Sequence, residues 1–218
     1  MSETLFSIHD EEKIKSLLSK NGEPAFRYAQ IENAIYKNFI TDFEDISTIS
    51  KKAKELLKSN CFYCSISLKS AKTSKDKQTT KLAFETYDKR YIESVIMRHL
   101  GGRNTLCVSC QVGCPMGCMF CETGKLGLKR NLEFYEIIDQ ILYASLLLNK
   151  EGKVLRNIVY MGMGEPFTNY ENVKKSIKIV CKKNKLDFSS RRVTISTCGI
   201  LEGIKNFGDD FPQTSLAI

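Results

Sequence analysis

The segment CVSCQVGCPMGCMFCETG, residues 107–124, places five cysteines within fifteen residues. Cys114, Cys118 and Cys121 form a C-x3-C-x2-C pattern on a glycine-containing stretch. Thiolates at this spacing can wrap a cubane iron-sulfur cluster and bind three of its irons. The remaining iron would stay open to a chelating small molecule, as catalytic metal sites keep one position for substrate. The pattern therefore predicts a catalytic iron-sulfur site.

A zinc site is the main alternative for these thiols. Cys107 and Cys110 form one C-x2-C pair, and Cys118 and Cys121 form another. Only seven residues separate the two pairs, and Cys114 would have no role. This spacing favours the iron-sulfur site over zinc.

The other cysteines are interpreted as packing residues. Cys61 and Cys64 are three residues apart on a predicted strand and should face opposite sides, while Cys181 falls on a predicted helix. A free cysteine in such a place behaves as a small apolar side chain.

Composition limits the class of protein. The chain has 218 residues, of which 42% are hydrophobic, enough for one core and a small additional module. The start, MSETLFSIHDEE, lacks a signal-peptide pattern, and the longest apolar stretch, 141–148, is too short to span a bilayer. We therefore expect a cytoplasmic protein. Nine cysteines in a reducing compartment favour metal or redox chemistry over a disulfide framework.

Positive charge is concentrated in the second part of the chain. Residues 1–60 contain 9 Lys and Arg against 10 Asp and Glu, whereas residues 61–218 contain 24 against 15. The formal net charge of +8 therefore comes entirely from residues 61–218. A modestly basic surface suits a partner that carries phosphate, because cations displace its condensed counterions.

Hydrophobic periodicity divides the chain into three regions. Helical spacing in DEEKIKSLLSK, FRYAQIENAIYKNF and SKKAKELLKS predicts an N-terminal helical accessory domain over residues 1–60. A period of two, with Phe62, Cys64, Ile66 and Leu68 on one side, predicts two or three antiparallel strands, a β extension over 61–98.

Residues 99–218 alternate between strand-like and helix-like segments. Strands are predicted at TLCVS, NIVYMG, RRVTIST and TSLAI, with helices at EFYEIIDQILYASLLL, NYENVKKSIKIVCKK and ILEGIKNF. The pattern predicts an α/β fold with about four parallel strands, either a doubly wound sheet or part of a barrel. The cysteine cluster, 162–166 and 196–199 each follow a strand. They should share one site, since the carboxyl ends of parallel strands meet at one edge.

These motifs resemble a known family. The C-x3-C-x2-C pattern with Phe120 before its last cysteine resembles the radical S-adenosylmethionine superfamily. CVSCQVGC, GLKRNL, MGMGEP and RRVTISTCG, with their spacing, are similar to the RlmN and Cfr family of adenosine C-methyltransferases of ribosomal and transfer RNA. The similarity extends from about residue 26 to residue 218. It implies that 99–218 is the N-terminal part of a radical-SAM (βα) barrel.

The resemblance also implies cofactor-binding residues. The three cysteines of the pattern match the ligands of a [4Fe-4S] cluster, whose open iron would chelate the amino and carboxylate groups of S-adenosyl-L-methionine. Gly164, Glu165 and Ser196 match the family's cofactor contacts. The residue types suit that task, because glycine allows close backbone approach, a carboxylate accepts from an ammonium, and a hydroxyl can donate or accept.

Two further residues are implied in catalysis. In the family, a cysteine is methylated, a radical removes hydrogen from that methyl group, and the methylene radical adds to carbon 2 of an adenine. Cys107 matches the cysteine that forms a disulfide to release the product, and Glu93 matches the proposed base. Without the resemblance, Glu93 would be interpreted as a solvated strand carboxylate.

The sequence departs from the family pattern in two places. Cys110 stands where relatives usually have serine, and is either a spare thiol near the cluster or a competing disulfide partner for Cys107. The resemblance places the methyl-carrying cysteine after Ile218, and none of the nine cysteines stands at its position. We therefore expect a barrel that is incomplete at its C-terminus and a chain that is inactive alone.

The resemblance implies RNA partners, namely 23S rRNA and tRNA, and a reducing electron donor of the flavodoxin type. GLKRNL and FPQTSLA are similar to the branch that methylates carbon 8 instead, whereas MGMGEP favours carbon 2. An alternative of another class is a non-catalytic iron-sulfur RNA-binding protein. It would dock on phosphates through LKSAKTSKDK and the lysines at 174, 175, 178, 182 and 183.

Overall fold

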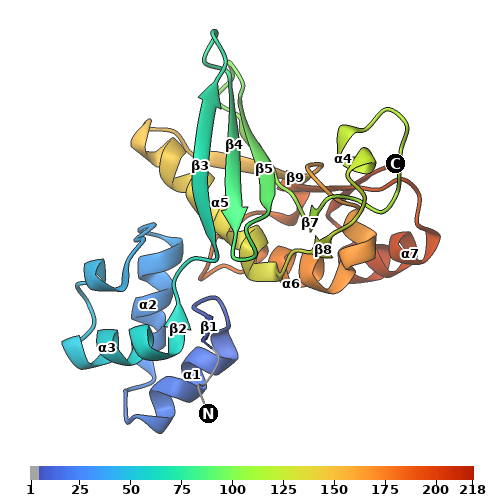
Figure 1. Cartoon of the computed structure of the whole chain (residues 1–218). Coiled ribbons are helices and arrows are strands. Elements are labelled where there is room, and N and C mark those ends of the chain that lie inside the picture. The colour runs from blue at the N-terminus through green and yellow to red at the C-terminus, as the bar shows by residue number, and fades with distance from the viewer. Residues whose placement is uncertain (1–4) are drawn as a thin grey trace.

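The computed structural model describes residues 5–218 and is built around one large sheet (Figure 1). Its seven strands run in the order β11-β10-β9-β6-β5-β4-β3. Two further pairs, β1-β2 and β7-β8, form small separate sheets. A module of short helices lies beside the large sheet, at the N-terminal end of the chain (Figure 1).

The three predicted helices of the N-terminal module are confirmed: α1 (Glu11–Lys20), α2 (Phe26–Tyr36) and α3 (Lys51–Asn60), with a short 3-10 helix η1 (Phe43–Asp45). Side chains cap two of them. Asp10 accepts from the Lys13 amide at 3.2 Å, and Ser50 accepts from the Ala53 amide at 3.2 Å. Each such cap stabilises its helix by about 1 kcal/mol. The chain closes the module by pairing β1 (Phe6–Ser7) with β2 (Cys61–Phe62) in parallel.

Three antiparallel strands follow, as predicted: β3 (Ile66–Thr73), β4 (Thr79–Thr86) and β5 (Tyr91–Arg98). The start of this region differs from the prediction. Cys61 pairs with β1, so the chain leaves the strand direction before Cys64, whose side chain is exposed. The expected alternation through Phe62 and Cys64 is therefore wrong, because Cys61 and Phe62 pair with β1 of the helical module and do not continue into β3.

The alternating region is also confirmed. Its parallel strands are β6 (Asn104–Cys107), β9 (Leu155–Tyr160), β10 (Val193–Ser196) and β11 (Ser215–Ala217). Its long helices are α5 (Phe134–Lys150), α6 (Tyr170–Cys181) and α7 (Leu201–Asp210). Shorter elements are β7 (Gln111–Val112), α4 (Glu122–Lys125), β8 (Arg130–Asn131), η2 (Pro166–Asn169) and η3 (Ser190–Arg192). Because β5 pairs antiparallel with β6, the β extension and the parallel strands form one continuous sheet.

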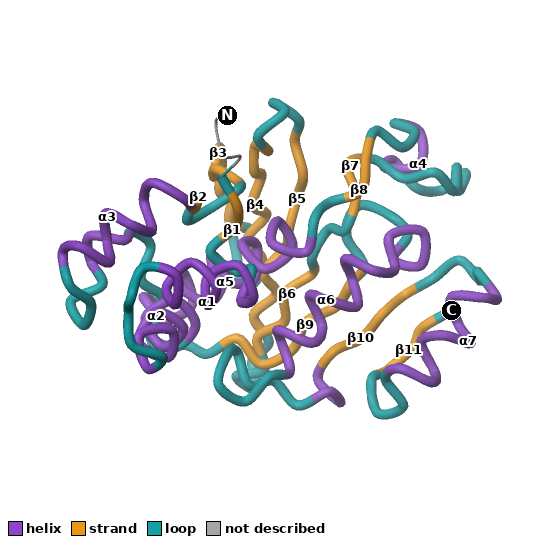
Figure 2. The backbone as a smooth tube through the Cα atoms, turned by 90° about the horizontal axis from the view of Figure 1, so that it is seen from below, coloured by secondary structure: helices purple, strands orange, loops and turns teal. Residues whose placement is uncertain are grey.

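The long helices cover one face of the sheet (Figure 2). Alternate strand residues such as Ile158 and Ile195 are fully buried there, as are Ile141 and Ile177 on the helices. Burying such a side chain stabilises the fold by about 1.5–3 kcal/mol. Strand residues of the opposite parity remain partly exposed. The sheet thus has a helix-covered face and an open face.

A buried polar network fastens the helical module to α5. The Asp139 carboxylate contacts His9 Nε2 at 2.9 Å and accepts from the Ser65 amide at 2.7 Å. The other ring nitrogen of His9 contacts the Tyr36 hydroxyl at 2.8 Å. Such a network is rigid when every member has a partner, so it fixes the module against the sheet.

A charged cluster forms a second connection between the module and the sheet. Burial opposes ionisation of Glu11, but hydrogen bonds from Lys15, Lys182 and Lys185 outweigh it and lower the Glu11 pKa to about 2. The Lys182 and Lys185 ammonium groups lie 2.7 and 3.1 Å from the carboxylate. The chain between α6 and β10 is thereby tied to α1.

This cluster should make stability depend on pH. The Glu11 pKa is depressed, so its contribution to stability is present above the unfolded-state value and lost as pH falls from about 4.5 to about 2. We expect Glu11→Gln to reduce the free energy of unfolding at pH 6 and to flatten its decrease in that acidic window. Urea unfolding at several pH values measures both. Glu12→Gln, on the exposed side of α1, is the control, and equal pH profiles for the wild type and Glu11→Gln would contradict the assignment.

Across residues 5–218, none of the helices combines the length and the apolar character needed to cross a bilayer.

Candidate functional site

Three loops meet at the carboxyl ends of β6, β9 and β10. The segment 108–111 lies against the loop after β9: the amides of Cys110 and Gln111 donate to the Met163 carbonyl at 2.9 and 3.1 Å. In return, the Met163 amide donates to Ser109 Oγ at 2.9 Å. The predicted convergence of these segments is therefore present in the structure.

Glycines make this contact geometrically feasible. A Cβ at Gly164, where φ is +108°, would lie 2.6 Å from the Cβ of Gln111. A Cβ at Gly162 would lie 2.7 Å from the Val108 carbonyl oxygen. Real Cβ atoms do not approach other atoms so closely, so the MGMGEP motif needs both glycines to bring the loop after β9 under the segment after β6.

Two amide side chains that the sequence did not single out organise the site. The buried Gln111 donates to Asn131 Oδ1 at 2.7 Å and to Thr168 Oγ1 at 2.8 Å, and accepts from the Glu165 amide at 2.8 Å. Asn169 is also buried and donates to the carbonyl of Cys110 at 2.7 Å. Gln111 lies inside the CVSCQVGC motif and Asn169 lies outside the quoted motifs, but neither residue carries a periodic signal that would reveal this role.

Glu165 is buried and connects two of the loops. Its Oε1 accepts from the Phe167 amide at 3.1 Å, which starts η2, and its Oε2 accepts from the Cys198 amide at 3.0 Å. The carboxylate therefore holds the loop after β10 to the loop after β9. Each carboxylate oxygen has a further lone pair, so the group can also accept from an ammonium, the cofactor contact that the resemblance implied.

The three cysteines of the C-x3-C-x2-C pattern share one tight loop. Gly117, with φ of +62°, turns the chain between Cys114 and Cys118, and the Cys121 amide donates to the Cys118 carbonyl at 3.0 Å. Burial, with the nearby thiols of Cys121 and Cys118, raises the Cys114 pKa. Bound iron would overcome this effect at Cys114, because a thiol that coordinates a metal loses its proton.

The zinc alternative is not supported by the geometry. Within residues 5–218, no three side chains of His, Cys, Asp or Glu are grouped closely enough to hold a single metal ion. A cubane cluster needs its thiolates further apart than one ion does, since each thiolate binds a different iron. Cys110 is buried beneath the loop after β9, with its amide held by Met163.

Glu93, Cys107 and Ser196 lie on the open face of the sheet. Glu93 and Cys107 are on the adjacent strands β5 and β6, and Ser196 is on β10, which β9 separates from β6. Cys107 pairs across the sheet with Val95 and Val159, which places it on the same face as Glu93, two residues from Val95. Ser196 follows Ile195, which is buried against the helices, so it faces the opposite, open side. All three stand near the strand ends from which the loops emerge.

The local environments of Glu93 and Cys107 differ. Glu93 is about half exposed, at 46%, and pairs with Lys81 Nζ at 2.8 Å. Cys107 is mostly buried, which raises its pKa to about 11. Burial also raises the pKa of Cys110. All nine cysteines are free thiols in this structure.

The GLKRNL motif has a structural role. Arg130 donates to both oxygens of Asp88, in the turn between β4 and β5, and to both oxygens of Glu136 on α5. A Cβ at Gly113 would lie 1.9 Å from the Gly127 carbonyl oxygen, so the two ends of the cysteine loop are in direct contact. The bidentate pairs that Arg130 forms with Asp88 and Glu136 fix geometry as well as adding energy. The motif thus closes the cysteine loop and ties it to the β extension.

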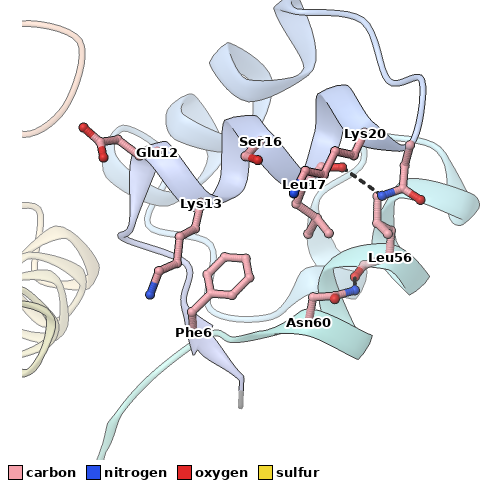
Figure 3. Close-up of a pocket in the computed structure, with 9 residues that line it drawn as sticks. Phe6, Glu12, Lys13, Ser16, Leu17, Lys20, Leu56 and Asn60 are labelled. Carbon is pink, nitrogen blue, oxygen red and sulfur yellow. Dashed lines mark hydrogen bonds between the residues drawn. The ribbon is translucent and has the colours of Figure 1, made fainter. Parts of the chain in front are cut away.

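A separate cavity of about 810 Å³ lies on the helical module, far along the chain from these residues (Figure 3). Phe6 points into it between Lys13 and Leu17, and Asn21 and Asn60 each donate to a helix carbonyl. None of the predicted site residues lines it.

Comparisons with known proteins agree with this fold and site. The chain belongs to the radical SAM superfamily, whose family model matches residues 108–217. Residues 6–62 match the model of the ribosomal RNA large subunit methyltransferase N-terminal domain. Radical SAM proteins of the RlmN type use a [4Fe-4S] cluster and S-adenosylmethionine.

Curated relatives resemble almost the whole chain. Two proteins named "Probable dual-specificity RNA methyltransferase RlmN", from Dictyoglomus turgidum and Aquifex aeolicus, are each 41% identical to it, over 94% and 95% of the chain. The chain spans 58% and 59% of the length of these relatives. A crystal structure of a radical SAM methyltransferase from Sphaerobacter thermophilus superposes with a TM-score of 0.93 and 33% identity, covering 97% of this chain and 62% of that one.

Proposed function

We propose that the chain provides the cluster-binding and base-positioning part of an RNA methyltransferase that methylates carbon 2 of an adenosine in 23S rRNA and in tRNA. One observation carries the proposal: the loop of Cys114, Cys118 and Cys121 stands at the same strand ends as Glu93 and Cys107. The similarity to proteins named as dual-specificity RNA methyltransferases supports the RNA substrates.

Each group of residues in the site would have its own role in this reaction. Cys114, Cys118 and Cys121 hold the cluster, and Gly164 and Glu165 bring the loop after β9 beside it. When bound, the cluster and S-adenosylmethionine supply one-electron reductive chemistry that generates a radical. The open face of the sheet would then present the adenine to the catalytic side chains.

Glu93 is proposed to take the proton from the attacked carbon, because its carboxylate is solvent-accessible and held in place by Lys81. Cys107 lies on the next strand and on the same face, where its thiol can form the disulfide that releases the product from the methyl-carrying cysteine. Ser196 completes the cofactor contacts on the other side of Cys107.

The site's location in the cell and its electron donor belong to the same proposal. Both RNA substrates are cytoplasmic, and the nine free cysteines suit a reducing compartment. A donor of the flavodoxin type would deliver the electron to the cluster, whose loop carries the exposed side chains of Met119 and Phe120.

Electron paramagnetic resonance of the anaerobically reconstituted chain tests the proposal. We expect the spectrum of the reduced cluster to change when S-adenosylmethionine is added, because an open iron binds it. An unchanged spectrum would indicate a fully ligated cluster and favour the non-catalytic RNA-binding alternative.

The methylated position needs a second measurement. Nucleosides can be analysed by mass spectrometry from rRNA incubated with a chimaera that joins this chain to the C-terminal segment of a relative. The proposal expects 2-methyladenosine. A product methylated at carbon 8 would contradict the position while keeping the reaction class.

A further inference from the structure

A basic cavity of about 500 Å³ lies at the end of the sheet opposite the cysteine loop. Three turns form it: the β3–β4 hairpin, which reaches the top of Figure 1, the β5–β6 turn, and the turn that precedes β9. Its lining includes four cations, Lys77, Arg98, Lys153 and Arg156, together with His99. No function described above uses this cavity.

Part of the positive charge in the cavity holds its walls together. Arg98 donates to both carboxylate oxygens of Glu151 and to Thr80 Oγ1 at 2.8 Å, which joins the end of β5 to the turn before β9. Lys153 pairs with the same Glu151 at 3.2 Å. The charges of Arg98 and Lys153 are therefore mainly engaged with the Glu151 carboxylate.

Lys77 and Arg156 remain available for a ligand. Both side chains are exposed, and among residues 5–218 no carboxylate forms an ion pair with either of them. The one carboxylate of the hairpin turn, Asp76, accepts from the Ser74 hydroxyl and from the Gln78 amide at 3.0 Å, so it is engaged in its own turn. The cavity consequently presents two cations without a carboxylate partner, Lys77 from the β3–β4 hairpin turn and Arg156 from the start of β9.

We propose that this cavity binds the phosphate backbone of RNA, with Lys77 and Arg156 as the contacting residues. Cations contributed by a hairpin turn and by a strand around an open depression suit a chain of phosphates, which positions a nucleic acid without reading its sequence. The inference rests on the proposed RNA substrate, and adds to it a second contact outside the catalytic end.

The distance between the two ends is compatible with one RNA molecule. Glu93 and Arg98 lie five residues apart on β5, which corresponds to about 17 Å along the strand, and this odd spacing turns their side chains to opposite faces of the sheet. An RNA that places an adenosine near Glu93 on the open face would reach the cavity by passing around the end of the sheet. The cavity would then orient the substrate rather than take part in the chemistry.

Fluorescence anisotropy with a fluorescein-labelled RNA stem-loop and the 218-residue chain tests this inference. We expect the double variant Lys77→Gln/Arg156→Gln to bind about tenfold more weakly than the wild type, because two phosphate contacts are lost. Between about 50 and about 200 mM KCl, the slope of log affinity against log salt should become shallower by about 1.5. A matched DNA stem-loop should show a similar loss, since the contacts are to phosphate.

The control variant also removes two positive charges, but at a place on the surface outside the cavity. Lys51→Gln/Lys52→Gln lies on exposed positions of α3 and should retain the wild-type affinity and salt slope. Equal losses in both double variants would mean that net charge, not the cavity, determines affinity, and would overturn the inference while leaving the proposed function standing. If the wild-type chain does not bind the RNA at the lowest salt, the proposed RNA substrate fails with it. Thermal melting of each variant confirms that it is folded.

Discussion

Cys118→Ala is expected to abolish iron-sulfur binding, whereas Cys198→Ala should leave it intact. The three thiols of the tight loop are the proposed cluster ligands, and removal of one leaves only two thiolates for the cubane. Reconstituted Cys118→Ala should therefore contain almost no iron. Iron and sulfide analysis after anaerobic reconstitution measures the loss.

Cys198 is the informative control because it is the thiol best placed to compete. Its side chain is exposed and stands near Cys118, and its amide is held by Glu165. If Cys198→Ala also lost the cluster, Cys198 would be a fourth ligand and no iron would remain open for S-adenosylmethionine. Retention of the cluster together with the spectral change on adding S-adenosylmethionine would support a site with three protein ligands.

Gly164→Ala is expected to destabilise the fold by about 4 kcal/mol. The φ of +108° is strained for any residue with a Cβ, which costs about 1–3 kcal/mol. The added Cβ would also lie 2.6 Å from the Cβ and 2.8 Å from the amide nitrogen of Gln111. Forcing these atoms apart costs about 1–3 kcal/mol more. Urea unfolding gives the change in free energy.

Gly199→Ala separates the two contributions. Gly199 has the same φ of +108°, but a Cβ there would meet nothing within 4 Å. We expect it to cost only the conformational strain, about 2 kcal/mol. Equal losses for the two variants would show that the loop after β9 can move away from Gln111, and that the close contact does not fix the site.

Gly164→Ala should affect the site as well as stability. Gln111 links the loop after β9 to Asn131 of the GLKRNL motif, which closes the cysteine loop. Displacement of Gln111 would therefore disturb both the loop that carries Glu165 and the loop that carries the cluster ligands. The same preparation of Gly164→Ala should retain less iron than Gly199→Ala.

Much of the secondary structure was determined by local sequence. The helices α1 and α3 begin at residues whose side chains cap them, Asp10 and Ser50, and their apolar residues recur at helical spacing. The strands and helices after residue 99 could be predicted for the same reason. Likewise, the spacing of Cys114, Cys118 and Cys121 predicts the cluster loop, because the proposed ligands lie on one short segment.

The sequence also indicated that certain residues belong to one site, but not how the fold brings them onto one face of the sheet. Glu93 and Cys107 were connected only by resemblance to a family, since they lie on different strands. The pairing of β5 with β6 places them on the open face side by side. Strand pairing depends on contacts between distant segments, which hydrophobic periodicity does not specify.

Other features were decided by the tertiary structure alone. Gln111 and Arg130 lie in motifs that the sequence singled out, but it assigned no role to either of them or to Asn169, yet their hydrogen bonds hold the three loops together. The incorrect prediction of a strand through Cys64 has the same origin. Cys61 and Phe62 pair with β1 and do not continue into the strand that was predicted there. Sequence determined the local elements and pointed to the proposed cluster ligands, whose geometry is set within a few residues. Packing decided how the loops are closed, because a buried polar side chain finds its partner only after the chain has folded around it.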